Sequence, residues 1–466
     1  MDHFCFSSIK LRTELLENLT SLNYLTMTPI QEKSLPPILA GNDVIAQGKT
    51  GSGKTAAFGL GLLEKLEVKR FCVQSLVLCP TRELADQVAK ELRKLARKIH
   101  NIKILTLCGG MPFGPQIGSL EHGAHIVVGT PGRIEEHLRK GTLDLQYLTV
   151  FVLDEADRML DMGFQVTLDA IITHMPRKRQ TLLFSATYPE QIQTIAKQIM
   201  IDPVIVRVAS THDEASIEQH FYKLSGDEQR MDALRLLLLA HCPESALVFC
   251  NTKRETQEVA DELVRYGFSA LALHGDLDQK ARDQILVRFS NKSASILVAT
   301  DVASRGLDID ALDAVINYHL SRDTEVHVHR IGRTGRAGSK GIACTLYTDK
   351  ESYKVAMLED YLKQDISNET LPSSNLLNKT PYQPAMVTLQ IDGGKKQKVR
   401  PGDILGALTG EKGIAGKHVG KISIDDNRAY VAINREVVKP ALKKLEEGKL
   451  KGRSFRVRQI CEQVFM

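Results

Sequence analysis

The segment Gly48–Thr55 constrains the fold of this 466-residue chain more than any other feature of its sequence. It reads GKTGSGKT and satisfies every fixed position of the phosphate-binding pattern GxxxxGK[ST]. A strand-like run, 43–46, precedes it, and an apolar helical stretch to Leu66 follows it. Glycines let backbone N–H groups approach phosphates, and a helix N-terminus adds positive charge. The segment therefore predicts a strand–loop–helix unit of a parallel sheet that binds a nucleotide phosphate.

Short apolar runs alternate with amphipathic segments over two blocks of the chain, 1–208 and 218–365. This alternation predicts α/β domains, each with a parallel sheet covered by helices on both faces. We expect the polar stretch Ser210–Ser216 to be a hinge and the segment 366–384, which has three prolines, to be a linker. The last module, 385–466, is predicted to run strand, helix, strand, strand, helix, strand, which is a split-βαβ pattern.

Charge is unevenly distributed along the chain. Pro384–Met466 contains 17 Lys and Arg against 9 Asp and Glu, whereas the preceding residues contain 44 against 47. A basic module suggests a polyanionic partner, and a solvated basic surface without function is an equal alternative. A hydrophobic content of 43% excludes disorder as the main state.

Neither a membrane span nor a disulfide framework is expected. No apolar run approaches the roughly 18 residues that a span requires, and the first residues lack the pattern of a secretory signal. The eight cysteines contain no CxxC pair, which indicates free thiols in a reducing cytosol.

A second chemical signal is the apolar run Val150–Leu153, which ends in the carboxylates Asp154 and Glu155. We expect Lys54 to pair with the β- and γ-phosphates, and Thr55 and Asp154 to hold Mg²⁺. Glu155 would orient or deprotonate the attacking water. Acidic residues after a strand also occur simply at helix N-termini, but the upstream phosphate loop favours the functional interpretation.

The sequence Asp-Glu-Ala-Asp at 154–157 is the motif that names the DEAD-box RNA helicases, and the chain resembles this family over residues 1–365. Thr28–Gln31, with Phe6 upstream, resembles the Q motif that reads adenine. The other motifs follow in order. They are Pro80–Leu84 (Ia), Gly109–Gly110 (GG), Thr130–Arg133 (Ib), Ser185–Thr187 (III), Phe249–Thr252 (IV), Gln279 with Arg282 (QxxR), Ala299–Asp308 (V) and His329–Arg336 (VI).

The resemblance implies two tandem RecA-like parallel-sheet domains, with ATP and Mg²⁺ as cofactors. The implied catalytic residues are Lys54, Asp154, Glu155 and the arginine fingers Arg333 and Arg336. The implied nucleotide contacts are Phe6, Gln31, Gly51, Ser52, Gly53, Lys54, Thr55 and Asp308. The implied RNA contacts of the core are Thr81, Arg82, Gly110, Thr130, Gly132, Arg133 and Thr300.

The C-terminal module resembles the RNA-binding domain of DbpA-type DEAD-box proteins. The similar segments are Leu389–Lys396, Arg400–Gly410, Val419–Ile422 and Lys449–Arg453. The resemblance implies a small α+β, RRM-like domain that targets large-subunit ribosomal RNA.

This module departs from an ordinary RRM, which stacks bases on aromatic residues of its first and third strands. The predicted strand Met386–Ile391 has no aromatic residue, and Arg428–Ile433 has only Tyr430. We therefore expect recognition of RNA backbone and shape by basic side chains. The basic residues that suggest this are Lys395, Lys396, Lys398, Arg400, Lys449, Lys451, Arg453, Arg456 and Arg458, and the site candidates among them are Lys395, Lys396, Lys449, Lys451 and Arg453. The alternative is that several of these residues only keep the module soluble.

Taken together, the sequence predicts a cytoplasmic, ATP-hydrolysing RNA helicase that unwinds or remodels short duplexes. We expect a monomer without a membrane partner, which the C-terminal module directs to 23S ribosomal RNA or large-subunit precursor particles during ribosome biogenesis. Two alternatives stay open. One is an ATP-gated RNA clamp that rarely separates strands, and the other is an RNA-binding protein with a silent ATPase, against which the intact Lys54, Glu155, Arg333 and Arg336 argue.

Overall fold

The computed structural model describes residues 5–48, 51–188, 190–208, 217–304, 312–321, 323–335, 340–411 and 413–460. The chain divides into two compact units at about residue 211. The first contains an N-terminal domain, here called lobe 1. The second contains a further α/β domain, lobe 2, and the C-terminal domain. The predicted hinge Ser210–Ser216 and the site candidates Asp308 and Arg336 lie outside the described residues.

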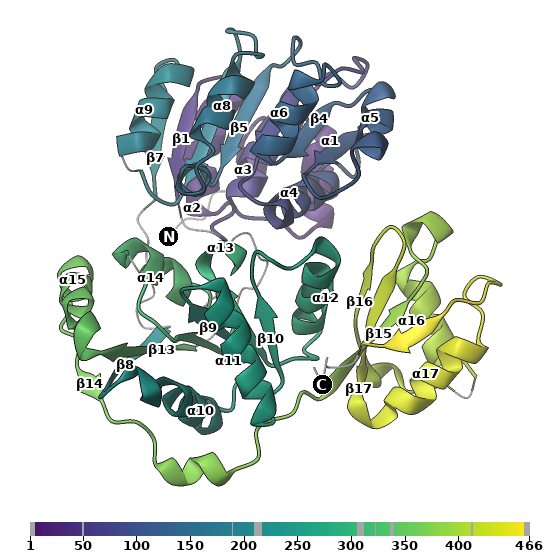
Figure 1. Ribbon diagram of the computed structural model, residues 1–466. Coiled ribbons are helices and arrows are strands. Elements are labelled where there is room, and N and C mark those ends of the chain that lie inside the picture. The colour runs from purple at the N-terminus through teal and green to yellow at the C-terminus, as the bar shows by residue number, and fades with distance from the viewer. Residues whose placement is uncertain are drawn as a thin grey trace. The chain divides into compact units, whose positions relative to one another are not determined.

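Lobe 1 is built on a parallel sheet (Figure 1). Its strands are β1 (Val44–Gln47), β2 (Ser75–Leu78), β3 (Ile104–Leu107), β4 (Ile126–Gly129), β5 (Val150–Asp154), β6 (Gln180–Ser185) and β7 (Val204–Arg207). They form seven strands in the order β3-β4-β2-β5-β6-β1-β7, and Val44 lies opposite Leu182 and Val204. Most of these strands are buried on both faces, as helices covering both sides of a parallel sheet require.

The helices of lobe 1 form two layers (Figure 1). They are α1 (Thr13–Ser21), α2 (Pro29–Ala40), α3 (Lys54–Lys65), α4 (Arg82–Leu95), α5 (Phe113–Glu121), α6 (Pro131–Arg139), α7 (Ala156–Asp161), α8 (Gln165–Ile172) and α9 (Glu190–Ile199). One core cluster joins α1 to α4 with the sheet through residues such as Phe58 and Leu92. The other joins α6 to α9 through residues such as Ile134 and Leu168. The sheet is therefore enclosed, and its carboxyl edge carries the exposed loops.

Lobe 2 has the same architecture. Its strands are β8 (Ile217–Leu224), β9 (Ala246–Cys250), β10 (Ala270–Leu273), β11 (Ile296–Thr300), β12 (Ala314–Asn317), β13 (Gly341–Thr348) and β14 (Asn368–Glu369). Its helices are α10 (Arg230–His241), α11 (Lys253–Arg265), α12 (Gln279–Ser290), α13 (Asp301–Ser304), α14 (Thr324–Ile331) and α15 (Ser352–Leu362). The strand order is β10-β11-β9-β12-β13-β8-β14, which repeats the order of lobe 1 strand for strand.

The segment 366–384, expected as a linker, carries structure of its own. Asn368–Glu369 forms the edge strand β14 beside β8, and Leu371, Leu376 and Leu377 pack against the core of lobe 2. A strand of two residues is too short to show an alternating pattern, so the sequence gives no periodic signal for it.

The C-terminal domain has an antiparallel sheet with helices on one face (Figure 1). Its elements are β15 (Met386–Ile391), α16 (Pro401–Thr409), β16 (Val419–Ile424), β17 (Ala429–Asn434), α17 (Val438–Glu447) and β18 (Val457–Gln459). The four strands lie in the order β16-β17-β15-β18, and Leu389 and Ile391 share a core with Ile404 and Leu445. The predicted fold class is confirmed, with two RecA-like parallel-sheet domains and a small RRM-like α+β domain.

Among the helices in the described ranges, none combines the length and the apolar character that a bilayer span needs.

Candidate active site

The phosphate loop lies between β1 and α3, at the carboxyl edge of the lobe 1 sheet. Gly51 and Gly53 adopt left-handed backbone conformations, with φ of 82° and 94°. Lys54 is only 6% exposed, and its Nζ donates a hydrogen bond to the carbonyl of Gly48 at 2.8 Å. Ser52 and Thr55 are half-buried beside it. The loop thus holds a buried ammonium group where backbone amides and a helix N-terminus converge, which suits a phosphate.

Gln31 is tied directly to this loop. The backbone N–H of Thr28 donates to Gln31 Oε1 at 2.9 Å, and Gln31 Nε2 donates to the carbonyl of Gly53 at 3.1 Å. A Cβ added to Gly53 would lie 2.5 Å from Gln31 Nε2, so only glycine allows this approach. Phe6 is 3% exposed and packs in the core of lobe 1, and its stacking on adenine stays a prediction.

Asp154 ends β5 and is buried, with Oδ1 lacking any hydrogen-bond partner among the described residues. Burial raises the pKa of this carboxyl group to about 7, although attraction to Lys54 opposes the rise. A buried oxygen without a partner is costly unless a ligand completes it. Asp154, with the Thr55 hydroxyl on α3, therefore fits the oxygen donors that Mg²⁺ prefers.

Glu155 follows in a left-handed conformation that is uncommon for residues other than glycine, with φ of 54°. It is 4% exposed, and its Oε2 lies 3.0 Å from Nη1 of Arg158. This ion pair orients the carboxylate at the end of β5.

Asp157, the last residue of the motif, connects β5 to β6. Its Oδ2 accepts hydrogen bonds from the backbone N–H groups of Ala186 and Thr187 at 3.2 and 3.0 Å, and from the Thr187 hydroxyl at 3.0 Å. Although burial opposes it, attraction to Lys54 and the bonds from Thr187 lower the pKa of Asp157. The resemblance to motif III was the only sequence signal for this contact, and it did not identify the partner.

Another group of candidates lies at the ends of β2, β3 and β4. Thr81 caps α4 by accepting the N–H of Leu84 at 3.3 Å. Gly110 has φ of 63°, and a Cβ added there would lie 1.6 Å from Nη2 of Arg82. The structure therefore brings motif Ia and the GG element into contact, and glycine is what leaves room for the guanidinium.

Arg133 of motif Ib reaches the same loop. Its Nη1 donates to the carbonyl of Met111 and to Gln116 Oε1, both at 3.0 Å. Thr130 precedes α6, and Gly132 in its first turn is exposed with nothing within 4 Å of an added Cβ. These candidates thus form one cluster with open space beside the backbone.

In lobe 2, Thr300 ends β11, is nearly buried, and accepts the N–H of Ala303 at 3.3 Å. Arg333 is 5% exposed, and its carbonyl accepts the N–H of Leu312 at 3.2 Å. Arg330 was not singled out from the sequence, but it is buried and joins two motifs. It binds both oxygens of Asp301 at 2.6 and 2.8 Å, and this joins motif VI to motif V.

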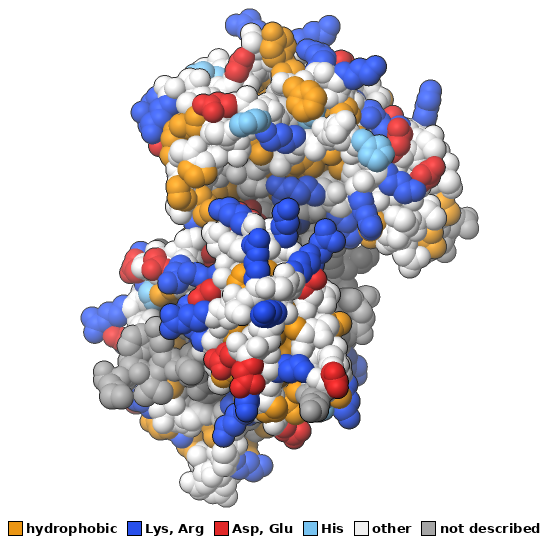
Figure 2. Space-filling view, turned by 90° about the vertical axis from the view of Figure 1, so that its right-hand side faces the viewer, with side chains coloured by type: hydrophobic (Ala, Val, Ile, Leu, Met, Phe, Trp, Pro, Cys, Tyr) orange, Lys and Arg blue, Asp and Glu red, His pale blue; other side chains and the backbone are white. Residues whose placement is uncertain are grey.

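The basic candidates of the C-terminal domain are exposed on two turns. Lys395 and Lys396 lie on one, and Lys449, Lys451 and Arg453 lie on the other. Lys451 Nζ donates to the carbonyl of Lys398 at 2.9 Å and lies 3.3 Å from Asp403, so the two turns are neighbours. Figure 2 shows many Lys and Arg side chains on the face that it draws.

The sheet face of this domain is covered within the second unit, which the sequence did not predict. Thr388 shares a hydrogen bond of 2.6 Å with Ser293 and accepts one of 3.2 Å from Asn291. Gln390 accepts one of 3.1 Å from Gln284, and it is fully buried with Tyr430 beside it. Two sequence features are consistent with a sheet face that is covered by protein. They are the lack of aromatic residues on β15 and the small polar side chain of Thr388.

Three family descriptions match the chain. Residues 28–195 match "DEAD/DEAH box helicase", 229–338 match "Helicase conserved C-terminal domain", and 388–459 match "DbpA RNA binding domain". The chain is 54% identical over 443 residues to the ATP-dependent RNA helicase DbpA of Escherichia coli K12, covering 95% of this chain and 96% of that protein. It is 42% identical to the DEAD-box ATP-dependent RNA helicase CshA of Geobacillus kaustophilus over 79% of each chain.

Two solved structures are similar to this chain in fold. Dbp5 of S. cerevisiae bound to RNA and ADP BeF3 has a TM-score of 0.70 at 29% identity, covering 81% of this chain and all of that one. Mss116p bound to ssRNA and AMP-PNP has a TM-score of 0.72 at 26% identity, with coverage of 80% and 81%. With the motif geometry above, these findings show that the chain belongs to the DbpA-type DEAD-box ATP-dependent RNA helicases and is an RNA-dependent ATPase.

Proposed function

We propose that this helicase remodels 23S ribosomal RNA during large-subunit assembly, and that its C-terminal domain, 385–466, selects the RNA. The observation that carries the proposal is the match of residues 388–459 to a DbpA RNA-binding domain whose sheet face is already buried. With Thr388 and Gln390 covered, RNA is left to the basic turns. Lys395, Lys396, Lys449, Lys451 and Arg453 would contact phosphates and 2′-hydroxyl groups rather than stack on bases.

For the nucleotide, we propose that Gln31 and Phe6 read adenine, Lys54 and the backbone of residues 51–53 bind the phosphates, and Asp308 binds the ribose. Thr55 and Asp154 would hold Mg²⁺, which when bound supplies positive charge against the phosphates. Support comes from the unpartnered Asp154 oxygen and from the Gln31–Gly53 hydrogen bond.

For the reaction, we propose that Glu155 accepts a proton from the attacking water, with Arg158 orienting the carboxylate. Arg333 and Arg336 would stabilise charge on the transferred phosphoryl group.

For the core RNA, we propose contacts mainly to the backbone. The residues are Thr81, Arg82, Gly110, Thr130, Gly132, Arg133 and Thr300. The direct contact of Arg82 with Gly110 and the bond from Arg133 to Met111 support a common surface. We further propose that the protein acts as a cytoplasmic monomer, with the domain limits 1–208, 218–365 and 385–466 and a connection at 366–384.

The test is ATP turnover by the full-length protein without RNA, with an unrelated RNA, and with 23S ribosomal RNA. Strong stimulation by 23S RNA alone supports the proposal. Equal stimulation by both RNAs makes the C-terminal domain a general anchor, and no stimulation favours an ATP-gated clamp. Deletion of 385–466 should abolish the preference while sparing stimulation at high RNA concentration. A retained preference in the truncated chain contradicts the targeting role.

A further inference from the structure

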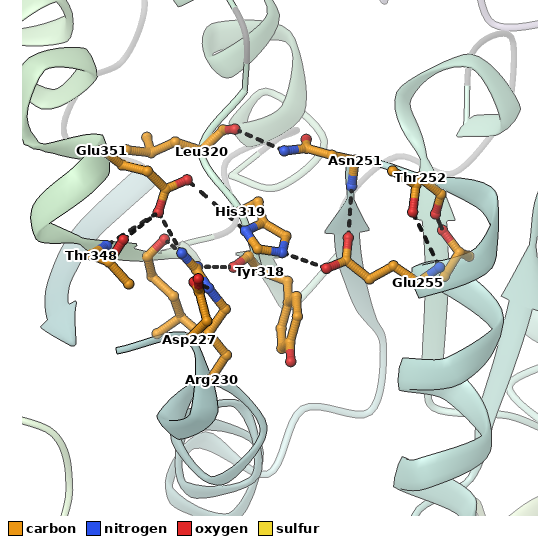
Figure 3. Close-up of polar contacts among 12 residues, drawn as sticks. Asp227, Arg230, Asn251, Thr252, Glu255, Tyr318, His319, Leu320, Thr348 and Glu351 are labelled. Atoms are coloured by element: carbon orange, nitrogen blue, oxygen red, sulfur yellow. Dashed lines mark hydrogen bonds and ion pairs between the residues drawn. The ribbon is translucent and has the colours of Figure 1, made fainter. Parts of the chain in front are cut away.

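The repeated strand order gives each loop of lobe 1 a counterpart in lobe 2. β8, β12 and β13 occupy the positions of β1, β5 and β6. Their carboxyl ends therefore correspond to the phosphate loop, to Asp154–Glu155 and to Ser185–Thr187 of lobe 1. In lobe 2 these places hold Arg230, His319 and Glu351, which Figure 3 shows in one polar cluster.

This cluster is not arranged to receive a second nucleotide. The Arg230 side chain is 2% exposed, and its Nε lies 2.8 Å from Asp227 while its Nη2 binds Glu351. Its Nη1 donates to the carbonyls of Tyr318 and Leu346. All three nitrogens of the cation are therefore bound inside the domain, and the carboxylates around it would repel a phosphate.

His319 lies between two carboxylates at the centre of the cluster (Figure 3). Its Nε2 is 2.5 Å from Oε1 of Glu255, and its Nδ1 is 3.9 Å from Oε1 of Glu351. All three side chains are mostly buried, with exposures of 18%, 26% and 14%. Hydrogen bonds to charged groups in such surroundings are stronger than those at an exposed surface.

The contacts of His319 form a closed ring. The second oxygen of Glu255 accepts the backbone N–H of Asn251, at 3.3 Å. Asn251 Oδ1 accepts a hydrogen bond from Nη2 of Arg330 at 3.3 Å. Arg330 Nη1 then donates to the carbonyl of His319 at 2.8 Å, which completes the ring. Asn251 belongs to motif IV and Arg330 to motif VI, and Arg330 also holds Asp301 of motif V.

We propose that His319 is a positioning residue for RNA-dependent ATP hydrolysis. It holds Asn251 of motif IV and Arg330 of motif VI in one arrangement. RNA that binds at motifs IV and V then meets a motif VI that is already in position. The His319 side chain acts on Asn251 through Glu255, while the main-chain carbonyl of His319 accepts the hydrogen bond from Arg330. The inference rests on the proposed placement of RNA against motifs IV and V.

The experiment measures ATP turnover by the full-length protein against RNA concentration. For His319→Ala we expect the half-maximal RNA concentration to rise about tenfold, as expected for the loss of one hydrogen bond to a charged group, with a smaller change in maximal turnover. His319→Gln keeps an N–H donor for Glu255 and should return the value to within about threefold of the unsubstituted protein.

Glu258→Gln is the matched control. Glu258 lies on α11, the helix that also carries Glu255, and it pairs with Arg254 at 2.6 Å. Both side chains of this pair are exposed and lie outside the ring. We expect no change in the half-maximal RNA concentration. If His319→Ala lowers the melting temperature but leaves the half-maximal RNA concentration unchanged, the cluster only stabilises the domain. That result would overturn the proposal.

If His319→Ala does not fold, Glu255→Ala decides in the same assay. It should raise the half-maximal RNA concentration, and adding His319→Gln to it should raise the value no further, because Glu255→Ala has already removed the contact that the glutamine would make. Additive effects overturn the inference. Thr300→Ala distinguishes failure of the inference about His319 from failure of the proposed function. If Thr300→Ala has no effect, the placement of RNA fails, whereas an effect of Thr300→Ala without one of His319→Ala removes only the role of His319.

Discussion

The two lobes share one strand order, but buried polar groups at their carboxyl edges are paired differently. In lobe 1, Asp154 is buried with an oxygen that has no partner, and its pKa is raised to about 7. In lobe 2, Arg330 lies in an equally buried position, but Asp301, Asn317, His319 and Asn251 all accept its hydrogen bonds. Buried polar groups in proteins are nearly always paired. The Asp154 oxygen without a partner therefore indicates a place for a ligand, whereas the paired Arg330 belongs to a network that holds chain segments together.

The largest effect is expected for Glu155→Gln, which tests whether the carboxyl edge of lobe 1 is a catalytic site. The amide cannot accept a proton from water, so ATP turnover should fall by about 10²–10⁴-fold while ATP binding persists. Turnover with saturating RNA and equilibrium binding of ATP measure the two effects. Glu121→Gln, an exposed change in the same lobe, is the control and should leave both unchanged. Near-normal turnover of Glu155→Gln would remove this residue from its role.

The buried carboxyl group of Asp154 itself predicts a pH dependence of stability. Because folding raises the pKa of Asp154 from 3.8 to about 7, the protonated form stabilises the nucleotide-free fold. That contribution is fully present below about pH 4 and is lost as the pH rises to about 7. Asp154→Asn should flatten this decline, which we expect to amount to about 2–4 kcal/mol.

Urea unfolding of the protein without nucleotide and without divalent cations, repeated across this pH range, measures the difference. Asp144→Asn provides the control, since that carboxylate is exposed in the same lobe. The same pH slope in the protein with and without Asp154 would show that the buried carboxyl group does not titrate in this range.

Local signals explain why much of lobe 1 could be predicted from sequence. The phosphate loop, the strand ending at Asp154 and the Thr28–Gln31 segment are each short and contiguous, and each carries its own composition pattern. The fold class followed from strand–helix alternation, which is also local.

Contacts between distant residues explain what the sequence did not reveal. The bonds from Thr187 to Asp157 join residues 30 apart, and Ser293 and Thr388 are 95 apart. Neither pair has a spacing that any helix or strand period would produce, so no pattern indicates it. The ring around His319 is of the same kind, because its members meet only when the ends of β9 and β12 lie side by side.

A smaller effect is expected for a substitution of Gly110 in lobe 1, because the guanidinium of Arg82 occupies the space that a side chain would need. Gly110→Ala strains a backbone with φ of 63° and places a methyl group on the Arg82 guanidinium. We expect RNA affinity to fall by about 10- to 100-fold, in line with about 1–3 kcal/mol of strain. Gly114→Ala is the control, because nothing lies within 4 Å of its added Cβ. Equal affinities of the two variants would show that Arg82 does not need this space to bind RNA.

An effect on stability alone is expected for the polar contact between the C-terminal domain and lobe 2, which tests whether a closed network holds chain segments here as well. Thr388→Val keeps the shape but removes the buried hydrogen bonds of Thr388 with Ser293 and Asn291. We expect the unfolding free energy of the second unit to fall by about 1–3 kcal/mol. Thr409→Val, at an exposed position of α16, should change it by less than about 0.5 kcal/mol. Calorimetry resolves the difference as an earlier transition of the C-terminal domain. Identical transitions for the two variants would mean that these hydrogen bonds do not stabilise the C-terminal domain. In that case the burial of a polar network would not show that it contributes to stability.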